Sequence, residues 1–230
     1  MTDAAETIDL DVLLAEFAQA VAAVEKPNTP RLRAVRRRFS RRLREAKPEK
    51  VLALAFRLLE SGKPRDRWFA YEFVHDHKPA LHSLDAPLLE RLGTGMASWD
   101  QVDSFAPYLS GVAWRRGQIG DEVIHRWAAS PDRWWRRAAL VSTVALNVKA
   151  RGGTGDVPRT LAVCELLVDD RDDMVVKAMS WALRAAGVHD PDAVSGFLER
   201  HEGRLAARVK REVRNKLETG LKNPGRGRRL

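Results

Sequence analysis

The stretch Asp132-Arg133-Trp134-Trp135-Arg136-Arg137-Ala138-Ala139 carries the pattern that decides the fold. An acid that can cap a helix is followed by aromatic and basic side chains and then by small apolar ones. Apolar residues continue at spacings of three and four, so Trp134, Ala138 and Val141 begin an expected core line that runs to Val148. The stretch therefore predicts an amphipathic helix whose first turn is cationic and aromatic.

Three other segments repeat this order of cap, aromatic or basic residues and alanine-rich stripe: residues 65–70, 97–100 and 175–186. The segment starts are about 30 to 40 residues apart, the step typical of stacked helical-hairpin repeats. No window shows the alternation of a β-strand. We therefore predict an all-α fold, a superhelical solenoid of HEAT-like helical-hairpin repeats whose inner helices line a concave basic groove. An irregular helical bundle is the alternative.

The length of the chain limits its domain organisation. A chain of 230 residues, 44% of them hydrophobic, can bury a core as one elongated domain or as two small ones. We predict a single repeat domain over residues 1–220, within which residues 1–26 form an acidic N-terminal helix or cap. Residues 221–230 are expected to form a basic, flexible tail.

Cysteine usage and the N-terminal sequence indicate the compartment. The single cysteine, Cys164, lies in an apolar run, so we expect it to be buried in a protein of a reducing compartment. The N-terminus lacks a signal pattern, and no apolar run approaches the roughly 20 residues of a membrane span. We expect a soluble cytoplasmic protein that does not bind membranes and that associates with the nucleoid when bound to DNA.

The charge points to a polyanionic partner. Because residues 1–26 hold six acids and one lysine while the whole chain carries +9, the other 204 residues carry +14. Arginine dominates over lysine, and guanidinium groups match phosphate oxygens and release condensed counterions on binding. Nucleic acid is the predicted partner. A solvated basic surface that serves solubility is the alternative.

One segment concentrates this charge, with eight arginines in the fourteen residues 31–44. Its apolar residues Leu32, Val35, Phe39 and Leu43 are three and four positions apart, which predicts an amphipathic helix with a cationic outer face. Such a face can hold a nucleic-acid backbone, with Arg36 and Arg37 as the candidate contacts. Pairing of this face with the acidic N-terminal segment is the alternative.

The segment Ser98-Trp99-Asp100-Gln101-Val102-Asp103 contains an acid that helix capping does not explain. Ser98 is an expected N-cap with Gln101 completing an approximate capping box, and Asp100 complements the helix dipole. Asp103 lies too far along the helix for either role and shares a face with Trp99. A salt bridge to an arginine of a neighbouring helix is its simplest structural explanation.

Further cations can face the same groove. Arg137 lies beside the expected core line, so it can reach a phosphate or Asp103 in the groove, whereas Arg136 lies on another face. A second cationic face combines residues four and three positions apart, Lys177, Trp181 and Arg184. The sequence holds no convincing metal site, phosphate-binding loop or activated thiol, and we expect neither a metal nor a cofactor.

The ordered set of Trp99 and Asp103, then residues 136–139, then residues 177–184 resembles the DNA alkylation repair glycosylases of the AlkD type. The resemblance spans roughly residues 28 to 220. It implies a HEAT-like solenoid that holds duplex DNA in a concave basic groove and excises N3- and N7-alkylated purines. The acidic N-terminal region matches weakly, and the loop around Gly152 is longer than usual.

The resemblance also implies roles for individual residues. Trp99 and Trp181 match the two indoles that contact the deoxyribose of the lesion, and Asp103 matches the catalytic carboxylate. Arg137, ahead of Arg136, matches the arginine that contacts a phosphate. Some relatives bind DNA without glycosylase activity.

The residues fit this chemistry. An N3- or N7-alkylated purine is already cationic and leaves as a neutral base, so one carboxylate suffices where ordinary glycosidases use two. Ionised Asp103 can stabilise the oxocarbenium ion. The resemblance implies a reaction that proceeds without base flipping. The predicted function is thus a monomeric glycosylase acting on double-stranded DNA that contains alkylated purines. The alternatives are a noncatalytic HEAT-repeat protein that binds damaged or branched DNA and a protein-interaction scaffold.

Overall fold

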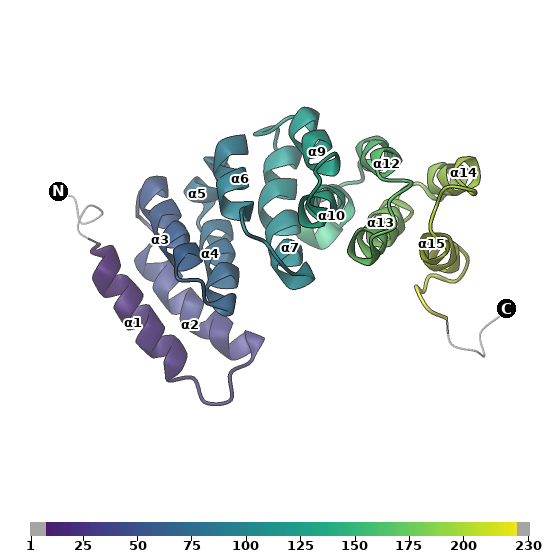
Figure 1. The fold of residues 1–230 in the computed structure, drawn as a ribbon. Helices are drawn as coiled ribbons and strands as arrows, with labels where there is room; N and C mark the ends of the chain where they lie inside the picture. Colours follow the sequence, from purple (N-terminus) through teal and green to yellow (C-terminus); the bar gives the residue numbers. More distant parts are fainter. Residues whose placement is uncertain (1–7, 225–230) are drawn as a thin grey trace. The chain divides into compact units, whose positions relative to one another are not determined.

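The computed structural model describes residues 8–224, and every regular element within that range is a helix (Figure 1). The all-α prediction is therefore confirmed. The chain divides into two compact units, one ending at Leu92 and one beginning at Gly93. The expected acidic cap and basic tail lie partly outside the described residues, which exclude 1–7 and 225–230.

Unit 1 contains α1 Leu10–Ala22, α2 Thr29–Arg42, α3 Pro48–Glu60, α4 Pro64–Asp76, α5 Lys78–His82 and most of α6 Ala86–Gly93. Its core is organised by Phe17 of α1. The Phe17 ring makes edge-on contacts with Phe39 of α2 and with Phe69 and Phe73 of α4, at centroid distances of 5.2, 4.9 and 5.3 Å. Three helices thus meet at one aromatic cluster.

The acidic face of α1 pairs with cations of its own unit. Glu16 accepts a hydrogen bond from Arg42 of α2, and Asp11 accepts one from Arg57 of α3. The alternative of pairing between the arginine-rich helix and the acidic N-terminal segment is therefore realised at Arg42. Within the described residues, no other arginine of α2 forms an ion pair with an acid of α1.

Unit 2 contains α7 Trp99–Phe105, a π-helical turn η1 Ala106–Ser110, α8 Gly111–Arg115, α9 Asp121–Ala128, α10 Arg133–Ser142, α11 Val144–Asn147, a 3-10 turn η2 Lys149–Arg151, α12 Val157–Leu166, α13 Asp173–Ala186, α14 Pro191–Arg200 and α15 Ala207–Thr219. The pairs α9 and α10, α12 and α13, and α14 and α15 lie side by side (Figure 1). In turn α10 packs on α13, and α13 packs on α15. Helical hairpins are thus present, while the superhelix and its basic groove stay predictions, as does the single domain over residues 1–220.

Side-chain caps explain several helix starts in unit 2. Asp132 caps α10 by accepting a hydrogen bond from the Trp134 N–H at 2.9 Å, and Asp172 caps α13 by accepting from the Met174 N–H at 2.8 Å. Ser98 stands at the N-cap of α7 but makes no side-chain capping bond. Gln101 instead accepts from the Ala97 N–H at 2.8 Å, so only part of the expected capping box forms.

The expected core line of α10 is wrong at its first residue. Trp135, not Trp134, joins the aromatic cluster, with its ring centroid 4.8 Å from Trp127 and 6.2 Å from Phe105. Both indoles are half-buried, but the Trp134 ring lies beside the guanidinium of Arg133 instead of in the cluster. Adjacent helical residues are about 100° apart, so when the Trp135 ring joins the cluster, the Trp134 ring points in a different direction.

A close approach between helices fixes the middle of unit 2. A Cβ on Gly111 would lie 2.4 Å from the Ser142 carbonyl oxygen and 2.7 Å from the Ala145 Cβ. Next to it, the hydroxyl groups of Ser110 and Ser142 are 2.8 Å apart and share a hydrogen bond. The end of η1 and the start of α8 are therefore pressed against the end of α10 and the start of α11.

Replacing Gly111 with alanine should destabilise the protein by about 1 to 3 kcal/mol, because the added methyl group has no space. Gly203 is a matched control, since a Cβ there would meet nothing within 4 Å. Chemical denaturation of both variants tests this expectation. A Gly111→Ala variant as stable as Gly203→Ala would contradict the close packing.

Candidate functional site

The helix α7 presents an indole and a carboxylate on one side, as the spacing of Trp99 and Asp103 predicts. Trp99 begins the helix and is 56% exposed, an unusual degree for so large an apolar ring. Asp103 lies one turn further on, where its side chain is 21% exposed. The helix thus places an accessible indole next to a carboxylate at the edge of the core.

Asp103 forms a bidentate ion pair with Arg137 of α10. The Arg137 Nη2 donates to Oδ1 at 2.8 Å and to Oδ2 at 3.0 Å, while Nε donates to Oδ1 at 3.1 Å. Arg137 also donates from Nη1 to the Met174 carbonyl oxygen of α13 at 2.6 Å. Of the two partners expected for Arg137, a phosphate or Asp103, the structure gives Asp103. The salt bridge considered as the structural explanation of Asp103 therefore exists.

The pair is partly buried, and this affects the charge state of the acid. Burial raises the pKa of Asp103 above its ordinary value, while the charges of Arg137 and Arg151 and the Arg137 hydrogen bonds oppose the rise. Asp100 raises the pKa further by like-charge repulsion. A carboxylate accepts about four hydrogen bonds, so the three from Arg137 leave Oδ2 able to accept from water or a ligand.

Trp181 of α13 is part of a cluster that the sequence did not indicate. The guanidinium carbon of Arg151 lies 5.6 Å from the Trp181 ring centroid and 4.7 Å from that of Tyr108. Because Arg151 also lowers the pKa of Asp103, its charge acts on that carboxylate. Tyr108 and Arg151 are therefore two site residues that sequence reasoning missed.

The π turn η1 explains why Tyr108 was missed. In an α-helix a residue five positions after Asp103 would lie on a different face, because 3.6 residues make a turn. The Gly111 N–H donates to the carbonyl oxygen of Ala106, five residues back, so this turn holds an extra residue. The extra residue changes the helical register of Tyr108 relative to Asp103, so α-helical spacing does not predict where its ring lies. Pro107 inside the helical pattern is the signal that could have drawn attention to this turn.

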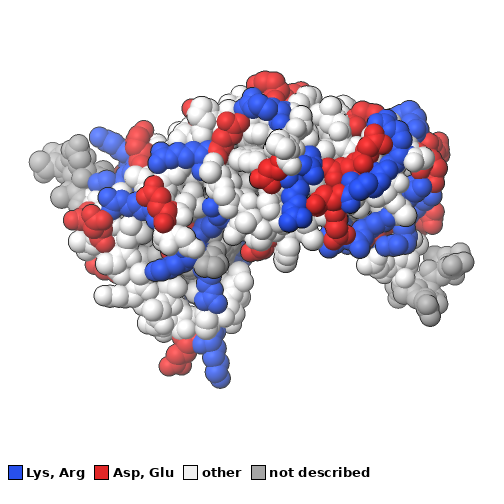
Figure 2. Space-filling model, in the orientation of Figure 1, with Lys and Arg blue, Asp and Glu red and all other residues white. Residues whose placement is uncertain are grey.

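The other predicted cations of unit 2 have protein partners. Arg136 pairs with Asp170 at 2.7 Å, and Lys177 pairs with Asp173 at 2.7 Å. Arg184 donates from Nε to the Ser180 hydroxyl at 3.2 Å. Toward the C-terminal end, Figure 2 shows basic and acidic side chains interspersed. Lys177, Trp181 and Arg184 share a helix, but each cation is tied to its own neighbour.

In unit 1 the structure separates the two arginines predicted to contact DNA. Arg36 is 6% exposed and pairs with Glu72 at 3.3 Å and with Asp76 at 2.6 Å, so it is a core cation rather than part of the outer face. Arg37 is exposed and lines a cleft of about 500 Å³. Of the two, only Arg37 is placed to meet a phosphate.

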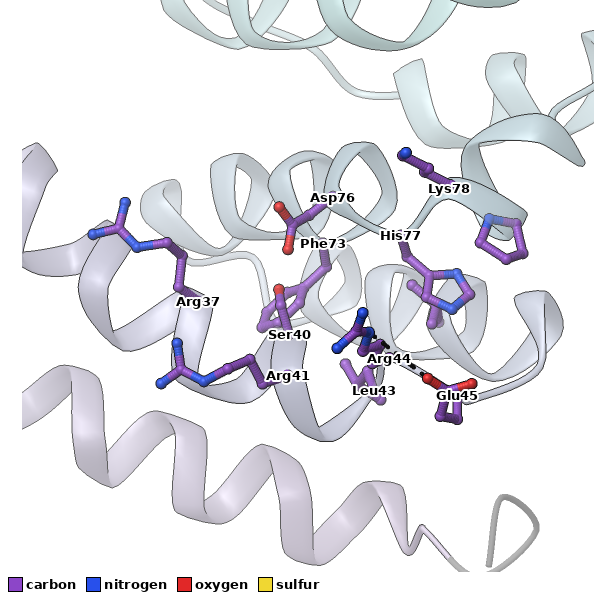
Figure 3. A pocket seen from close by; sticks show the side chains of 12 residues that line it. Arg37, Ser40, Arg41, Leu43, Arg44, Glu45, Phe73, Asp76, His77 and Lys78 are labelled. Carbon is purple, nitrogen blue, oxygen red and sulfur yellow. Dashed lines mark ion pairs between the residues drawn. The ribbon is translucent and has the colours of Figure 1, made fainter. Parts of the chain in front are cut away.

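The cleft beside Arg37 is rich in cations. Arg41 and Lys78 also line this cleft, and Arg44, another lining residue, pairs with Glu45 (Figure 3). Within residues 8–224, no carboxylate pairs with Arg37 or Arg41. Three cations without a described acidic partner therefore border one opening.

None of the helices in residues 8–224 combines the length and the apolar character that a membrane crossing requires.

The Asp103–Arg137 pair should contribute to stability more than surface pairs do. A double-mutant cycle with Asp103→Asn and Arg137→Lys should give a coupling of about 0.5 to 3 kcal/mol, because a partly buried bidentate pair loses its geometry. The exposed pair Arg204–Asp169 should give about 0 to 1 kcal/mol in the same denaturation assay. Equal couplings would show that burial adds nothing to the Asp103 pair.

Comparisons with known proteins bear on the site as a whole. A family model described as DNA alkylation repair enzyme matches residues 27–217. The match includes Trp99, Asp103, Arg137, Tyr108 and Trp181. No curated protein matches the chain.

Proposed function

The chain belongs to the DNA alkylation repair enzyme family, and from this we propose that it is a DNA glycosylase that excises N3- and N7-alkylated purines from duplex DNA. The single observation that carries the proposal is the pairing of Asp103 with Arg137 one helical turn from the exposed Trp99. A partly buried carboxylate and an unburied indole on one face suit a substrate that is itself cationic.

The chemistry requires little from the protein besides charge. Alkylation at N3 or N7 makes the purine a cation, so the bond to the sugar breaks with departure of a neutral base and without a general acid. Positive charge then develops on the sugar. Ionised Asp103 stabilises that charge, and the free acceptor position on Oδ2 can orient the attacking water.

In this proposal Arg137 is a positioning residue rather than a DNA contact. Its fork fixes both oxygens of Asp103, and its bond to the Met174 carbonyl fixes the guanidinium itself. Because Arg137 is only 5% exposed, a phosphate could reach it only by displacing these partners. Its charge also favours the ionised form of Asp103, which the reaction needs.

The indoles provide a surface for the sugar. Trp99 offers an exposed ring next to Asp103, and Trp181 of α13 lies beside Arg151, whose charge acts on the same carboxylate. Contact with sugar and backbone from outside the base stack requires no base-flipping pocket. We assign phosphate contacts in unit 1 to Arg37 and Arg41, which border the cleft.

The test is release of 7-methylguanine from methylated duplex DNA. Asp103→Asn should lower the single-turnover rate about 100- to 1000-fold, since a preorganised charge at the developing cation is lost. Asp100→Asn is the matched control, because it removes the same charge one turn earlier from an exposed position and should stay near the wild-type rate. DNA affinity and melting temperature, measured for both variants, separate catalysis from binding and folding.

Two outcomes would oppose the proposal. An Asp103→Asn rate equal to that of wild type would remove the catalytic role of the carboxylate. Salt-dependent DNA binding by a folded wild-type protein with no base release would favour the second candidate, a noncatalytic DNA-binding protein. That candidate is supported by the Asp103–Arg137 pair itself, because both carboxylate oxygens already have a protein partner.

The rate should also depend on pH through Asp103. The carboxyl is active when ionised, so activity is present above its pKa and is lost as the pH falls through it. Burial raises that pKa, so the loss should occur at higher pH than for an exposed aspartate. Single-turnover rates measured across acidic pH, and corrected for spontaneous depurination, show the pH at which this activity is lost. A flat profile in a protein that remains folded would contradict this role.

A further inference from the structure

Arg151 takes no part in the ion pairs that hold Arg136, Arg137 and Arg159 of unit 2. Its guanidinium lies over Tyr108 and Trp181, and its Nη1 is buried with no hydrogen-bond partner. Within residues 8–224, no carboxylate forms an ion pair with it. By contrast, Arg159 also lies over an indole, that of Trp114, but pairs with Asp156 at 2.6 Å. The Arg151 guanidinium thus stacks on aromatic rings, but no acidic group in contact with it neutralises its charge.

The backbone that carries Arg151 is fixed. Arg115 of α8 donates to the carbonyl oxygen of Arg151 and to that of Ala145, the latter at 2.9 Å. The Arg151 N–H donates to the Val148 carbonyl at 2.8 Å. The next residue, Gly152, has φ of 78°, and a Cβ there would lie 3.0 Å from the Arg115 guanidinium nitrogens. The η2 turn therefore presents Arg151 from a rigid support.

A stacked guanidinium keeps the donors at its edge directed away from the ring faces. This leaves it able to bind a phosphate in the plane of the fork while the aromatic rings hold its orientation. Arg137 has no such freedom, because Asp103 and the Met174 carbonyl take its donors. Of the two arginines that act on Asp103, Arg151 is therefore the one available to an anion.

We propose that Arg151, oriented by Tyr108 and Trp181, binds a backbone phosphate of the DNA strand beside the nucleotide that faces Asp103. This rests on the proposed function, since it takes duplex DNA as the ligand of this site. The contact positions the sugar relative to Asp103, because the same residue touches Trp181 and acts electrostatically on the carboxylate. Arg151 is a positioning residue in this scheme and takes no part in bond breaking.

The first experiment uses DNA binding alone and so does not depend on catalysis. Fluorescence anisotropy with an undamaged duplex, over a series of salt concentrations, compares wild type with Arg151→Gln and Arg159→Gln. Arg151→Gln should weaken binding about 10-fold and lower the slope of log affinity against log salt by about one. Arg159→Gln should leave the slope unchanged, since that arginine is already paired. An unchanged slope and affinity in Arg151→Gln would overturn the proposal.

A second variant guards against a purely structural effect. Arg151→Lys keeps the charge but loses the fork and much of the stacking, so it should retain the salt slope while binding more weakly than wild type. If an Arg151 variant has a lower melting temperature but, while folded, keeps the wild-type DNA affinity and salt slope, the role of Arg151 is structural and the phosphate contact is excluded. Arg151→Gln and Arg151→Lys with identical slopes would likewise overturn the phosphate contact.

The second experiment adds a catalytic readout. In Arg151→Gln the acidic limb of 7-methylguanine release should move to higher pH, because the charge that opposes the rise in the pKa of Asp103 is gone while Arg137 and Asp100 still face it. Absence of base release by wild type would count against the glycosylase and leave the binding result standing. Base release by wild type together with unchanged DNA binding by Arg151→Gln would support the glycosylase and overturn the phosphate contact.

Discussion

The ion pair of Asp103 and Arg137 is the interaction on which the site depends. It joins α7 to α10, and the Arg137 bond to the Met174 carbonyl extends the connection to α13. Three helices that are distant in sequence are thereby tied at one guanidinium. The same pair orients a partly buried carboxylate and opposes the rise in its pKa that burial causes, so an interaction that stabilises the fold also favours the ionised form that the proposed reaction needs.

The π turn after α7 is the second constraint. Gly111 lets α8 approach the Ser142 carbonyl closely, and the extra residue in the preceding turn changes the helical register of Tyr108. Tyr108 can then hold Arg151, which Arg115 fixes from the same segment of helix. The irregular turn thus supplies an aromatic ring against which Arg151 packs, and the charge of Arg151 acts on the carboxylate.

The arginines of this chain are divided between structure and surface. Arg36, Arg136 and Arg137 are tied to acids inside or at the edge of the core. Arg37 borders an open cleft, and Arg151 stacks on aromatic rings without an acidic partner among the described residues. A net charge of +9 therefore predicts a polyanionic partner, but it does not identify the cations that are free to bind it.

Much of the local structure can be predicted from the amino-acid sequence alone. Apolar spacing of three and four gave the helices, aspartates at the caps gave the starts of α10 and α13, and a four-residue step put Trp99 and Asp103 on one side. The sequence also carried the family resemblance. The pairing of Asp103 with Arg137, the burial of Arg36 and the packing of Arg151 on Tyr108 depend instead on how the helices pack. Helical periodicity follows from neighbours a few residues apart, whereas these contacts join residues more than thirty positions apart or depend on a turn that breaks the period.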